Sequence, residues 1–477
     1  LDMASGRTAR ELLGAYISSY PQPARAWCVN RAGWYGSAYV TPSRVFGTTA
    51  DGLEVVFQHA GAPSTAPASS GTLDDWKQHV AALAVGNSRL VLVISAAFAG
   101  AVLAILGLEG GGIHLNGASS TGKSTAQVAG ASVSGNPTKV VRSWRNTPAG
   151  LEGVAVQHND GTLFLEEIGE ADPRQVGLDA YMLANGQQKQ RASPTGAARP
   201  TTTWRTLFVS TGELSMAAHM ATAGRRPAAG QELRIVDIAA DAGAGHGLFE
   251  ELHGHPNARA LADALRDAAG RFHGTAGPAW LAWLAERRQK IADSARAALD
   301  QFVAAVLADA RNPSAQAGRV ARRFGAIAVA GELATLAGIT GWPRGEARRA
   351  AQVCFLAWLE AFGHAPAEER ALLDGVREFV ERHGASRFRD FTAPSHVVHQ
   401  SAGYYRIDDG RRVYLFHRSG LAEACRGAEL RWAVRALMER GWLIPGKDGR
   451  PTHHLRPEGM PDMRLYQIDP AAWAGEN

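Results

Sequence analysis

The sequence predicts an α/β core built on a largely parallel sheet, and three observations lead to that fold class. Apolar strand-like segments alternate with helical patterns between residues 110 and 240, as in sheets that are covered on both faces. A glycine-rich loop separates the first of these strands from the helix after it. Residues 257–362 show helical patterns only, so a helical part is expected to follow the sheet.

The glycine-rich loop carries the most specific motif. Residues 117–124, GASSTGKS, fit the pattern GxxxxGK[ST] at every fixed position. Backbone N–H groups of such a loop cradle phosphate oxygens, the lysine reaches the β- and γ-phosphates, and the last hydroxyl binds Mg²⁺. The expected ligands are therefore ATP and Mg²⁺. The candidate nucleotide-binding residues are Gly117, Ser119, Ser120, Thr121, Gly122, Lys123, Ser124 and Thr125.

The composition is that of an ordinary globular protein. The chain has 477 residues, 45% of them hydrophobic and 20% charged, which predicts two to four domains. The formal net charge of +5 is compatible with nucleic-acid binding but does not establish it. The three cysteines make no disulfide or metal-binding pattern, so a cytoplasmic location is expected.

The apolar run at residues 90–108 has the length of a membrane span. It is rich in alanine, is interrupted by Ser95, Gly100 and Gly107, and leads within a few residues into the strand before the phosphate loop. We therefore expect a buried helix and no association with a membrane.

Turn-forming segments with Gly, Pro and Asp divide the chain into four expected domains. A small strand-rich N-terminal unit spans 1–72 and ends in a linker at 61–71, and the ATPase core spans 73–250. A helical lid covers 251–364, and a winged-helix-like module, with helices at 368–383 and 428–441 and strands at 413–416 and 464–468, covers 365–477.

The order of elements after the phosphate loop follows from local signals. Thr147 and Pro148 suit the cap and the first position of a helix. The expected strands of the core are 112–116, 139–144, 162–167, 205–211 and 233–238, and the expected helices between them are 147–158 and 172–185.

The strand at 162–167 ends abruptly in two carboxylates. Beside a phosphate loop this is the Walker B arrangement, in which Glu166 holds Mg²⁺ together with Ser124 and Glu167 polarises the attacking water. The alternative is a solvated pair of loop carboxylates.

Further candidates lie at the ends of the next strands. Ser210 and Thr211 are placed to act as a sensor that hydrogen-bonds the water or the γ-phosphate. Arg234 interrupts an apolar strand, so it is either an edge-strand arginine or a finger that reaches the nucleotide of a neighbouring subunit.

Two basic groups have open alternatives. One of Arg319, Arg322 and Arg323 could contact the γ-phosphate of its own chain, or all three could form a solvated helix face. Lys189 and Arg191 precede a Pro-Thr-Gly turn, which suits a hairpin that grips the phosphates of single-stranded DNA; a solvated loop is the alternative.

Several strings in this order resemble the "domain of unknown function 927" family. The supporting segments are 86–90, 110–115, 119–123, 147–152, 183–186 with Lys189 and Arg191, 210–213, 230–234, 274–278, 331–334 and 341–343. The family comprises AAA+ ATPases of phages, plasmids and genomic islands, and is similar to the minichromosome-maintenance and superfamily III replicative helicases.

The resemblance implies an AAA+ phosphate-loop core in a hexameric ring that hydrolyses ATP between subunits. It implies translocation on single-stranded or forked DNA through Lys189 and Arg191, supports Arg234 as the finger, and suggests a primase-like domain ahead of Leu1. Glu166 departs from the family, which usually has Asp there.

The leading hypothesis from the sequence is an ATP-driven DNA helicase of a mobile genetic element that acts in replication. The alternative from another class is an ATP-gated DNA-binding or loading switch that does not unwind DNA. A small-molecule kinase fits less well because it has no use for the C-terminal parts, and a transport ATPase lacks support because no LSGGQ-like signature is present.

Overall fold

The structure is a computed structural model, and the chain forms two compact units, Leu1–His364 and Ala365–Asn477. The finer predicted boundaries within the first unit stay predictions. The described residues are 6–20, 25–49, 51–58, 68–190, 201–225, 227–308, 315–362, 367–393, 398–408, 410–426, 428–446 and 449–473. Most of the predicted linker at 61–71 and Arg191 lie outside them.

A five-stranded, wholly parallel sheet forms the centre of the first unit, so the prediction of a parallel sheet is confirmed. The order across the sheet is β10-β6-β9-β8-β7. The strands are β6 (Gly111–Asn116), β7 (Arg142–Ser143), β8 (Gly161–Glu166), β9 (Thr206–Gly212) and β10 (Ile235–Ala239). The phosphate-loop strand β6 therefore lies between β10, at one edge, and β9.

The strand predicted at 139–144 was wrong in its first half. Pro137–Val140 form the short helix α5, and only Arg142–Ser143 pair with β8. The side chain of Asn136 accepts a hydrogen bond from the N–H of Thr138, and Pro137 occupies the first turn. This capping signal outweighs the β-branched residues that follow it.

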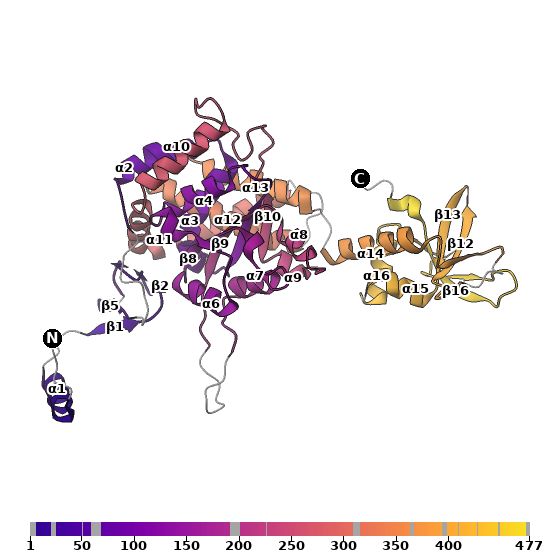
Figure 1. Ribbon diagram of the computed structural model, residues 1–477, viewed down its shortest axis with the longest axis horizontal. Helices are drawn as coiled ribbons and strands as arrows, with labels where there is room; N and C mark the ends of the chain where they lie inside the picture. The colour runs from indigo at the N-terminus through magenta and orange to yellow at the C-terminus, as the bar shows by residue number, and fades with distance from the viewer. Residues whose placement is uncertain are drawn as a thin grey trace. The chain divides into compact units, whose positions relative to one another are not determined.

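Helices cover both faces of the sheet (Figure 1). One face packs on α3 (Ser88–Leu106) and α4 (Lys123–Ala131). The other face packs on α6 (Pro148–Gln157), α7 (Val176–Asn185) and α8 (Met216–Ala221). The side chain of Thr147 caps α6 with Pro148 at its first turn, as the sequence predicts.

The membrane-length apolar segment is the buried helix α3. Of the most apolar window of this helix, 89% is buried inside the protein. It lies against the sheet and against α12 (Ala315–Leu336) and α13 (Glu346–Phe362). The close approach to β8 depends on Gly100, because a Cβ there would lie 2.1 Å from the carbonyl carbon of Gly161.

Helices also form the part of the first unit after β10, as the sequence predicts. Besides α12 and α13 these are α10 (Ala258–Arg271) and the long helix α11 (Ala276–Ala308), while α9 (Ala229–Glu232) precedes β10. Before α3 the chain forms α2 (Leu73–Trp76), the π-helix η1 (Lys77–Ala81) and the 3₁₀ turn η2 (Ala82–Ala84). The side chain of Thr72 caps α2 through a reciprocal pair of hydrogen bonds with Asp75.

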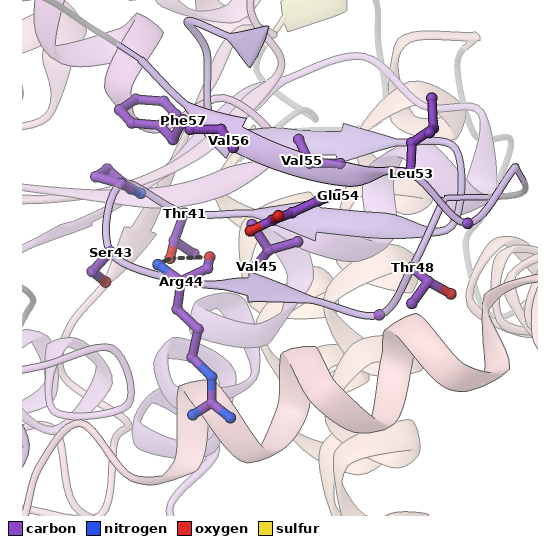
Figure 2. A pocket seen from close by; sticks show the side chains of 13 residues that line it. Thr41, Ser43, Arg44, Val45, Thr48, Leu53, Glu54, Val55, Val56 and Phe57 are labelled. Atoms are coloured by element: carbon purple, nitrogen blue, oxygen red, sulfur yellow. Dashed lines mark hydrogen bonds between the residues drawn. The ribbon is translucent and has the colours of Figure 1, made fainter. Parts of the chain in front are cut away.

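The N-terminal strands form two small sheets after the helix α1 (Arg7–Ser19). The parallel pair is β1 (Ala26–Val29) with β5 (Glu54–Phe57), and the antiparallel sheet is β2 (Gly33–Tyr35), β3 (Ala38–Val40) and β4 (Val45–Phe46). The antiparallel sheet is anchored on the turn before β8, where the Tyr39 hydroxyl donates to the Asp160 carbonyl at 2.7 Å. A pocket of about 590 Å³ lies beside β4 and β5 and contains no part of the phosphate loop. Figure 2 shows the residues that line it, which lie between Thr41 and Phe57.

The second unit contains more sheet than the sequence predicts. Six strands pair in one network, in which β12 and β13 form a hairpin between the predicted helices. The strands are β11 (Phe388–Asp390), β12 (Gly403–Asp408), β13 (Arg411–Phe416), β14 (Leu443–Ile444), β15 (His453–Leu455) and β16 (Met463–Ile468). The helices are α14 (Ala367–His383), α15 (Arg418–Ala424) and α16 (Leu430–Glu439). The simple order of helix, helix and hairpin was therefore wrong.

The contact at Gly100 makes a testable prediction about stability. Gly100→Ala should destabilise the first unit by about 1–3 kcal/mol, because the added methyl group overlaps the backbone of β8. The matched control is Gly153→Ala in α6, where the Cβ meets nothing within 4 Å; it should add about 0.5–1 kcal/mol through helix propensity. Denaturant titration measures both, and equal stability of the two variants would contradict the tight packing.

Candidate nucleotide-binding site

The phosphate loop lies at the carboxyl end of β6 and leads into α4, which begins at Lys123. Gly117 and Gly122 adopt φ values of 155° and 97°. Ser120 is also left-handed, with a φ of 65°. Within the described chain, the backbone N–H groups of residues 120–124 donate to no protein acceptor. This concave set of unpaired donors at a helix N-terminus suits an anion of several oxygens.

Lys123 supplies the positive charge of the loop. The side chain is only 8% exposed, and Nζ donates to the carbonyls of Gly117 and Ala118 at 2.8 and 2.7 Å. Burial lowers the pKa of Lys123, while the carboxylates of Glu213 and Glu167 act in the opposite direction. Lys123 therefore lies within electrostatic range of two acidic groups at the same edge of the sheet.

Glu166 and Glu167 leave β8 in different ways. Glu166 is the exposed last residue of the strand and has the same orientation as Phe164, which packs on the face covered by α3 and α4. Glu167 turns out of the strand with a φ of 54°, and its Oε1 accepts from the N–H of Gly169 at 3.3 Å. The two carboxylates are thus presented separately rather than as a pair.

The structure separates the two predicted sensor residues. Thr211 faces α4, where its hydroxyl donates to Oε1 of Gln127 at 3.2 Å. Ser210 is fully buried on the opposite face, so the prediction that Ser210 contacts the nucleotide was wrong. The physical reason is the strand geometry, since neighbouring residues of one strand point to opposite faces of the sheet.

Ser210 belongs to a buried chain of hydrogen bonds. Trp144 Nε1 donates to Ser210 Oγ at 2.8 Å, and His114 Nδ1 lies 2.8 Å from the same oxygen. His114 Nε2 lies 2.9 Å from the Leu214 carbonyl, which can only accept. His114 therefore carries its proton on Nε2, and the Ser210 hydroxyl donates to Nδ1. Burial lowers the pKa of His114 to about 4, so the neutral ring is held inside the sheet.

Glu213 is an acidic residue of this edge to which the sequence analysis assigned no role. It follows β9 directly, and the last residue of that strand pairs with Asn116, next to the phosphate loop. The signal that could have identified it is its position one residue after a central parallel strand, since the carboxyl ends of such strands line the site. Among the described residues no three His, Cys, Asp or Glu side chains form a metal centre. Mg²⁺ often binds through only one or two carboxylates plus phosphates, so Ser124 and Glu166 remain suitable candidates.

A glycine-rich segment after β10 supports the phosphate loop from its other side. Leu248 N–H donates to the Thr121 carbonyl at 2.8 Å, and the Ala240 N–H donates to the Asn116 carbonyl at 2.7 Å. Gly247 has a φ of 61°, and a Cβ there would lie 2.9 Å from the Thr121 oxygen. Only glycine fits this approach without displacing the phosphate loop.

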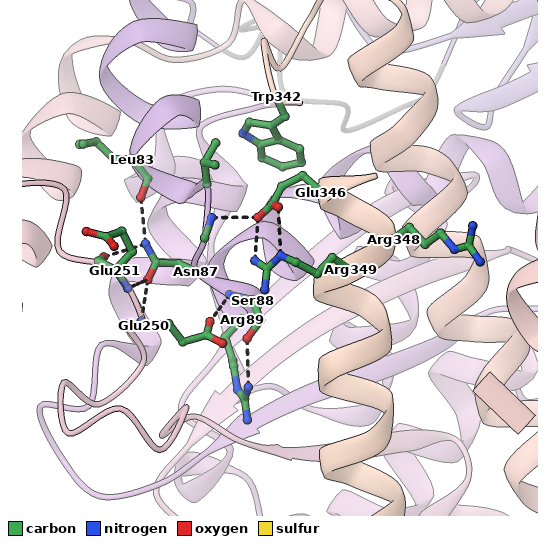
Figure 3. Close-up of polar contacts among 12 residues, drawn as sticks. Leu83, Asn87, Ser88, Arg89, Glu250, Glu251, Trp342, Glu346, Arg348 and Arg349 are labelled. Atoms are coloured by element: carbon green, nitrogen blue, oxygen red, sulfur yellow. Dashed lines mark hydrogen bonds and ion pairs between the residues drawn. The ribbon is translucent and has the colours of Figure 1, made fainter. Parts of the chain in front are cut away.

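A polar network fixes that segment to the start of α3 (Figure 3). Asn87 Oδ1 accepts from the N–H groups of Glu250 and Glu251 at 2.7 and 2.9 Å, and the Glu250 carboxylate accepts from the Ser88 N–H. Arg89, which is 4% exposed, donates to the Ala239 carbonyl at 3.3 Å. The end of β10 and the segment after it are therefore held by buried polar groups.

The same network extends to α13. The Glu346 carboxylate accepts from the Gly86 N–H at 2.8 Å and from Arg349 at 2.7 and 3.0 Å (Figure 3). Burial raises the pKa of Glu346. The hydrogen bonds from Arg349 and Gly86, together with the Arg349 charge, outweigh burial and hold this pKa below its usual value. The helical part of the unit is thereby attached to the edge of the sheet that carries the phosphate loop.

Arg234 lies at the amino ends of the strands, opposite the carboxyl ends that carry the phosphate loop. It precedes β10, whose first residue, Ile235, pairs with Gly112 at the start of β6. Because β6 spans roughly 17 Å at about 3.3 Å per residue, Arg234 is separated from the phosphate loop of its own chain by the length of a strand. The arginine therefore directly precedes the edge strand β10 rather than lying within it.

One prediction for Arg319, Arg322 and Arg323 is that one of them contacts the γ-phosphate bound by its own chain. The position of α12 does not support this contact. Arg323 donates to the carbonyls of Gly112 and Leu233 at 3.2 and 3.0 Å, so this part of α12 lies at the amino ends of the strands. Arg322 pairs with Asp300 at 3.2 Å, and Arg319 lies one turn earlier on α12. The turn of α12 that carries Arg322 and Arg323 lies at the amino edge of the sheet, away from the phosphate loop of the same chain.

The predicted basic hairpin leaves the core at the amino edge. Gln188 N–H donates to the Thr202 carbonyl at 2.9 Å and Trp204 N–H to the Gly186 carbonyl at 2.8 Å, which makes an antiparallel stem. Lys189 is exposed on this stem, where its N–H donates to Glu152 of α6. Arg191 lies outside the described residues.

A parallel sheet covered on both faces, with a phosphate loop at its carboxyl edge, defines an α/β core of the nucleoside-triphosphatase class. Residues 2–203 match the family model "Domain of unknown function (DUF927)", which confirms the resemblance seen in the sequence. A solved structure named "SCCmec type IV Cch - active helicase" is similar in fold, with a TM-score of 0.68 and 18% identity. That match covers 98% of this chain and 84% of the other. No curated protein matches this chain.

The buried His114 predicts a pH dependence of stability. Its pKa of about 4 lies below the ordinary 6.5, so the unfolded chain binds a proton between these values that the folded chain does not. His114 therefore contributes roughly 3 kcal/mol to the free energy of unfolding at pH values above about 6.5, and this contribution is lost as the pH falls to about 4.

The variant His114→Gln should remove this contribution and flatten the dependence relative to the unmodified chain. Burial raises the pKa of Asp237 to about 6, so Asp237 makes the stability change with pH in the opposite direction. Asp237 is present in both proteins, and its effect therefore cancels when their free energies of unfolding are compared. Chemical unfolding at pH 7 and pH 5 measures the effect. Parallel curves for the two proteins would show that His114 is protonated inside the fold.

Proposed function

We propose that this protein is an ATP-driven DNA helicase or translocase that works as a ring, with each nucleotide bound between two subunits. The observation that carries the proposal is the distribution of catalytic groups over the two edges of one sheet. Lys123, Glu167 and Thr211 lie at the carboxyl edge, and Arg234 lies at the amino edge. This distribution supports a site whose two halves come from neighbouring copies of the chain.

The carboxyl edge supplies the groups that phosphoryl transfer requires. The N–H groups of residues 120–124 and the ammonium of Lys123 stabilise the phosphate charge, and Glu167 orients the attacking water. Ser124 and Glu166 would hold Mg²⁺, which neutralises charge on the β- and γ-phosphate oxygens when bound. Thr211, on the same face as Glu166, is the sensor residue of this proposal.

The amino edge supplies the trans-acting arginine and the DNA contact. Arg234 would stabilise the charge that develops on the nucleotide of the neighbouring subunit. The stem with Lys189 leaves the core at this edge, and with Arg191 it would contact the phosphates of single-stranded DNA in the centre of a ring. ATP hydrolysis and DNA movement would then meet at one subunit interface.

The remaining parts take supporting roles in the proposal. Helices α10–α13 would form the lid of the ATPase core, and the second unit would be a winged-helix-like module. The similar structure is named as an active helicase, and that name supports a helicase function. The hexameric ring, the mobile genetic element and the role in replication are part of this proposal.

A second function, an ATP-gated DNA-loading switch without unwinding activity, is favoured by one observation. Glu166 replaces the expected Asp at the metal position, and its longer side chain is exposed at the end of β8. A strand-displacement assay on a forked substrate separates the two functions, because the switch binds the fork without separating its strands.

Mixing of two inactive variants tests the shared site. Lys123→Ala and Arg234→Ala should each lose nearly all hydrolysis, the latter because an arginine finger contributes about 10³–10⁵ in rate. An equimolar mixture should regain about one quarter of the full activity, because in a head-to-tail ring one interface in four joins two intact halves. Steady-state ATPase assays measure this. A mixture that stays inactive while each variant still assembles would show that both groups act on the nucleotide of their own chain, which contradicts the shared site.

Removal of the hairpin charges tests the DNA contact. Lys189→Ala combined with Arg191→Ala should weaken binding to single-stranded DNA and reduce the salt slope by about 1–2, because two phosphate contacts are lost. Basal ATPase activity without DNA should persist. Fluorescence anisotropy over a range of salt concentrations measures the slope, with Arg174→Ala, a surface arginine outside the hairpin, as control. Unchanged DNA affinity of the double variant would remove the hairpin from the proposal.

A further inference from the structure

Arg234 is held by two side chains of the helix that leads into the basic hairpin. Its Nε donates to Oδ1 of Asn185 at 3.1 Å, and its guanidinium carbon lies 5.3 Å from the centre of the Tyr181 ring. Asn185 is the last residue of α7, and Tyr181 lies one turn earlier. Both side chains are exposed, so the contacts stand at the surface and not in the core.

These contacts leave the terminal nitrogens of Arg234 available. Among the described residues Nη1 and Nη2 donate to no acceptor, since the hydrogen bond to Asn185 uses Nε alone. A guanidinium fixed at Nε and over an aromatic face can still present two parallel N–H groups to phosphate oxygens. The geometry is that of an arginine oriented for an external anion.

A second arginine limits where Arg234 can go. Arg323 donates to the carbonyls of Gly112 and Leu233, and Leu233 directly precedes Arg234. Burial and the charge of Arg234 lower the pKa of Arg323 to about 10. Two like charges repel one another, so Arg323 both fixes the backbone before Arg234 and disfavours its retreat into the core.

The hold on Arg234 is directly connected to the hairpin stem. Gly186 follows Asn185 with a φ of 68°, and a Cβ there would lie 2.0 Å from the carbonyl oxygen of Trp204. The Trp204 N–H in turn donates to the Gly186 carbonyl at 2.8 Å. Because this junction is tight, a displacement of the stem is transmitted to Asn185 over a single residue.

We propose that Asn185 and Tyr181 are positioning residues that orient Arg234 toward the nucleotide of the neighbouring subunit, and that DNA on the hairpin acts on hydrolysis through this contact. The inference rests on the proposed function, since it requires Arg234 to act in trans. It assigns to α7 the connection between the DNA contact and the ATPase site.

The test compares kinetic constants of single variants in the full chain. Asn185→Ala and Tyr181→Ala should each lower the DNA-stimulated kcat by about tenfold, because a misplaced catalytic group loses up to about 10²-fold in rate. The KM for ATP and the affinity for DNA should stay within about twofold, since neither residue contacts the phosphate loop or the hairpin charges.

Two conservative variants serve as matched controls. Asn185→Asp keeps the acceptor oxygen and Tyr181→Phe keeps the aromatic face, so both should retain nearly full DNA stimulation. If each alanine variant behaves as its conservative partner does, Asn185 and Tyr181 have no role in positioning. Thermal unfolding checks that all four variants are folded, which is expected because both side chains are exposed.

The result also distinguishes this inference from the proposed function. If Arg234→Ala loses activity and Asn185→Ala retains normal DNA stimulation, the inference is overturned and the shared site stands. If Arg234→Ala itself hydrolyses ATP normally with DNA, the trans-acting role fails and the inference fails with it.

Discussion

The directionality of parallel strands is the constraint on which this structure depends. All five strands of the central sheet run the same way, so every βα loop is delivered to one edge and every αβ connection to the other. The parallel arrangement alone therefore places the phosphate loop and the acidic end of β8 at the same edge of the sheet. Arg234 and the hairpin stem are the connections before β10 and β9, and they share the opposite edge for the same reason. The separation of the candidate catalytic groups is a consequence of topology.

The apolar helix α3 and the polar network at its start make the carboxyl edge rigid. Burying a charged arginine is costly unless its N–H groups are bonded, and Arg89 donates to Ser88, Ala239 and Asp241. These bonds tie the end of β10 to α3, which is itself fixed by close packing of Gly100 on β8. The phosphate loop thus rests on a segment that cannot shift without exposing a buried charge. Such rigidity suits a site that stabilises charge by preorganised groups.

The elements that the sequence predicted well are those with strong local signals. The phosphate loop is marked by its glycines, and α6 by the Thr147 cap with Pro148 behind it. Ser210 could not be separated from Thr211, because a strand that is buried on both faces shows no polar alternation to reveal which side each residue faces. The position of Arg323 at the amino ends of the strands could not be predicted either, because its partners are backbone carbonyls far away in the sequence. The extra strands of the second unit are short, between two and six residues, and short strands give little periodicity.

The buried chain from Trp144 to Leu214 shows how the inner layer of the sheet affects the site. Trp144 follows β7, Ser210 belongs to β9 and His114 to β6, so the chain of hydrogen bonds crosses three separate parts of the sheet. It ends on the Leu214 carbonyl, immediately after Glu213 and within the loop that follows Thr211. If His114 were protonated, Ser210 Oγ would have to accept from both Nδ1 and Trp144, and the Ser210 hydroxyl proton would lose the Nδ1 acceptor that it has in the neutral state. The bond from Nε2 to the Leu214 carbonyl links the buried ring to the loop after β9, which carries Glu213 near Lys123. The face of the sheet opposite α3 and α4 thus contributes to the position of Glu213 beside Lys123.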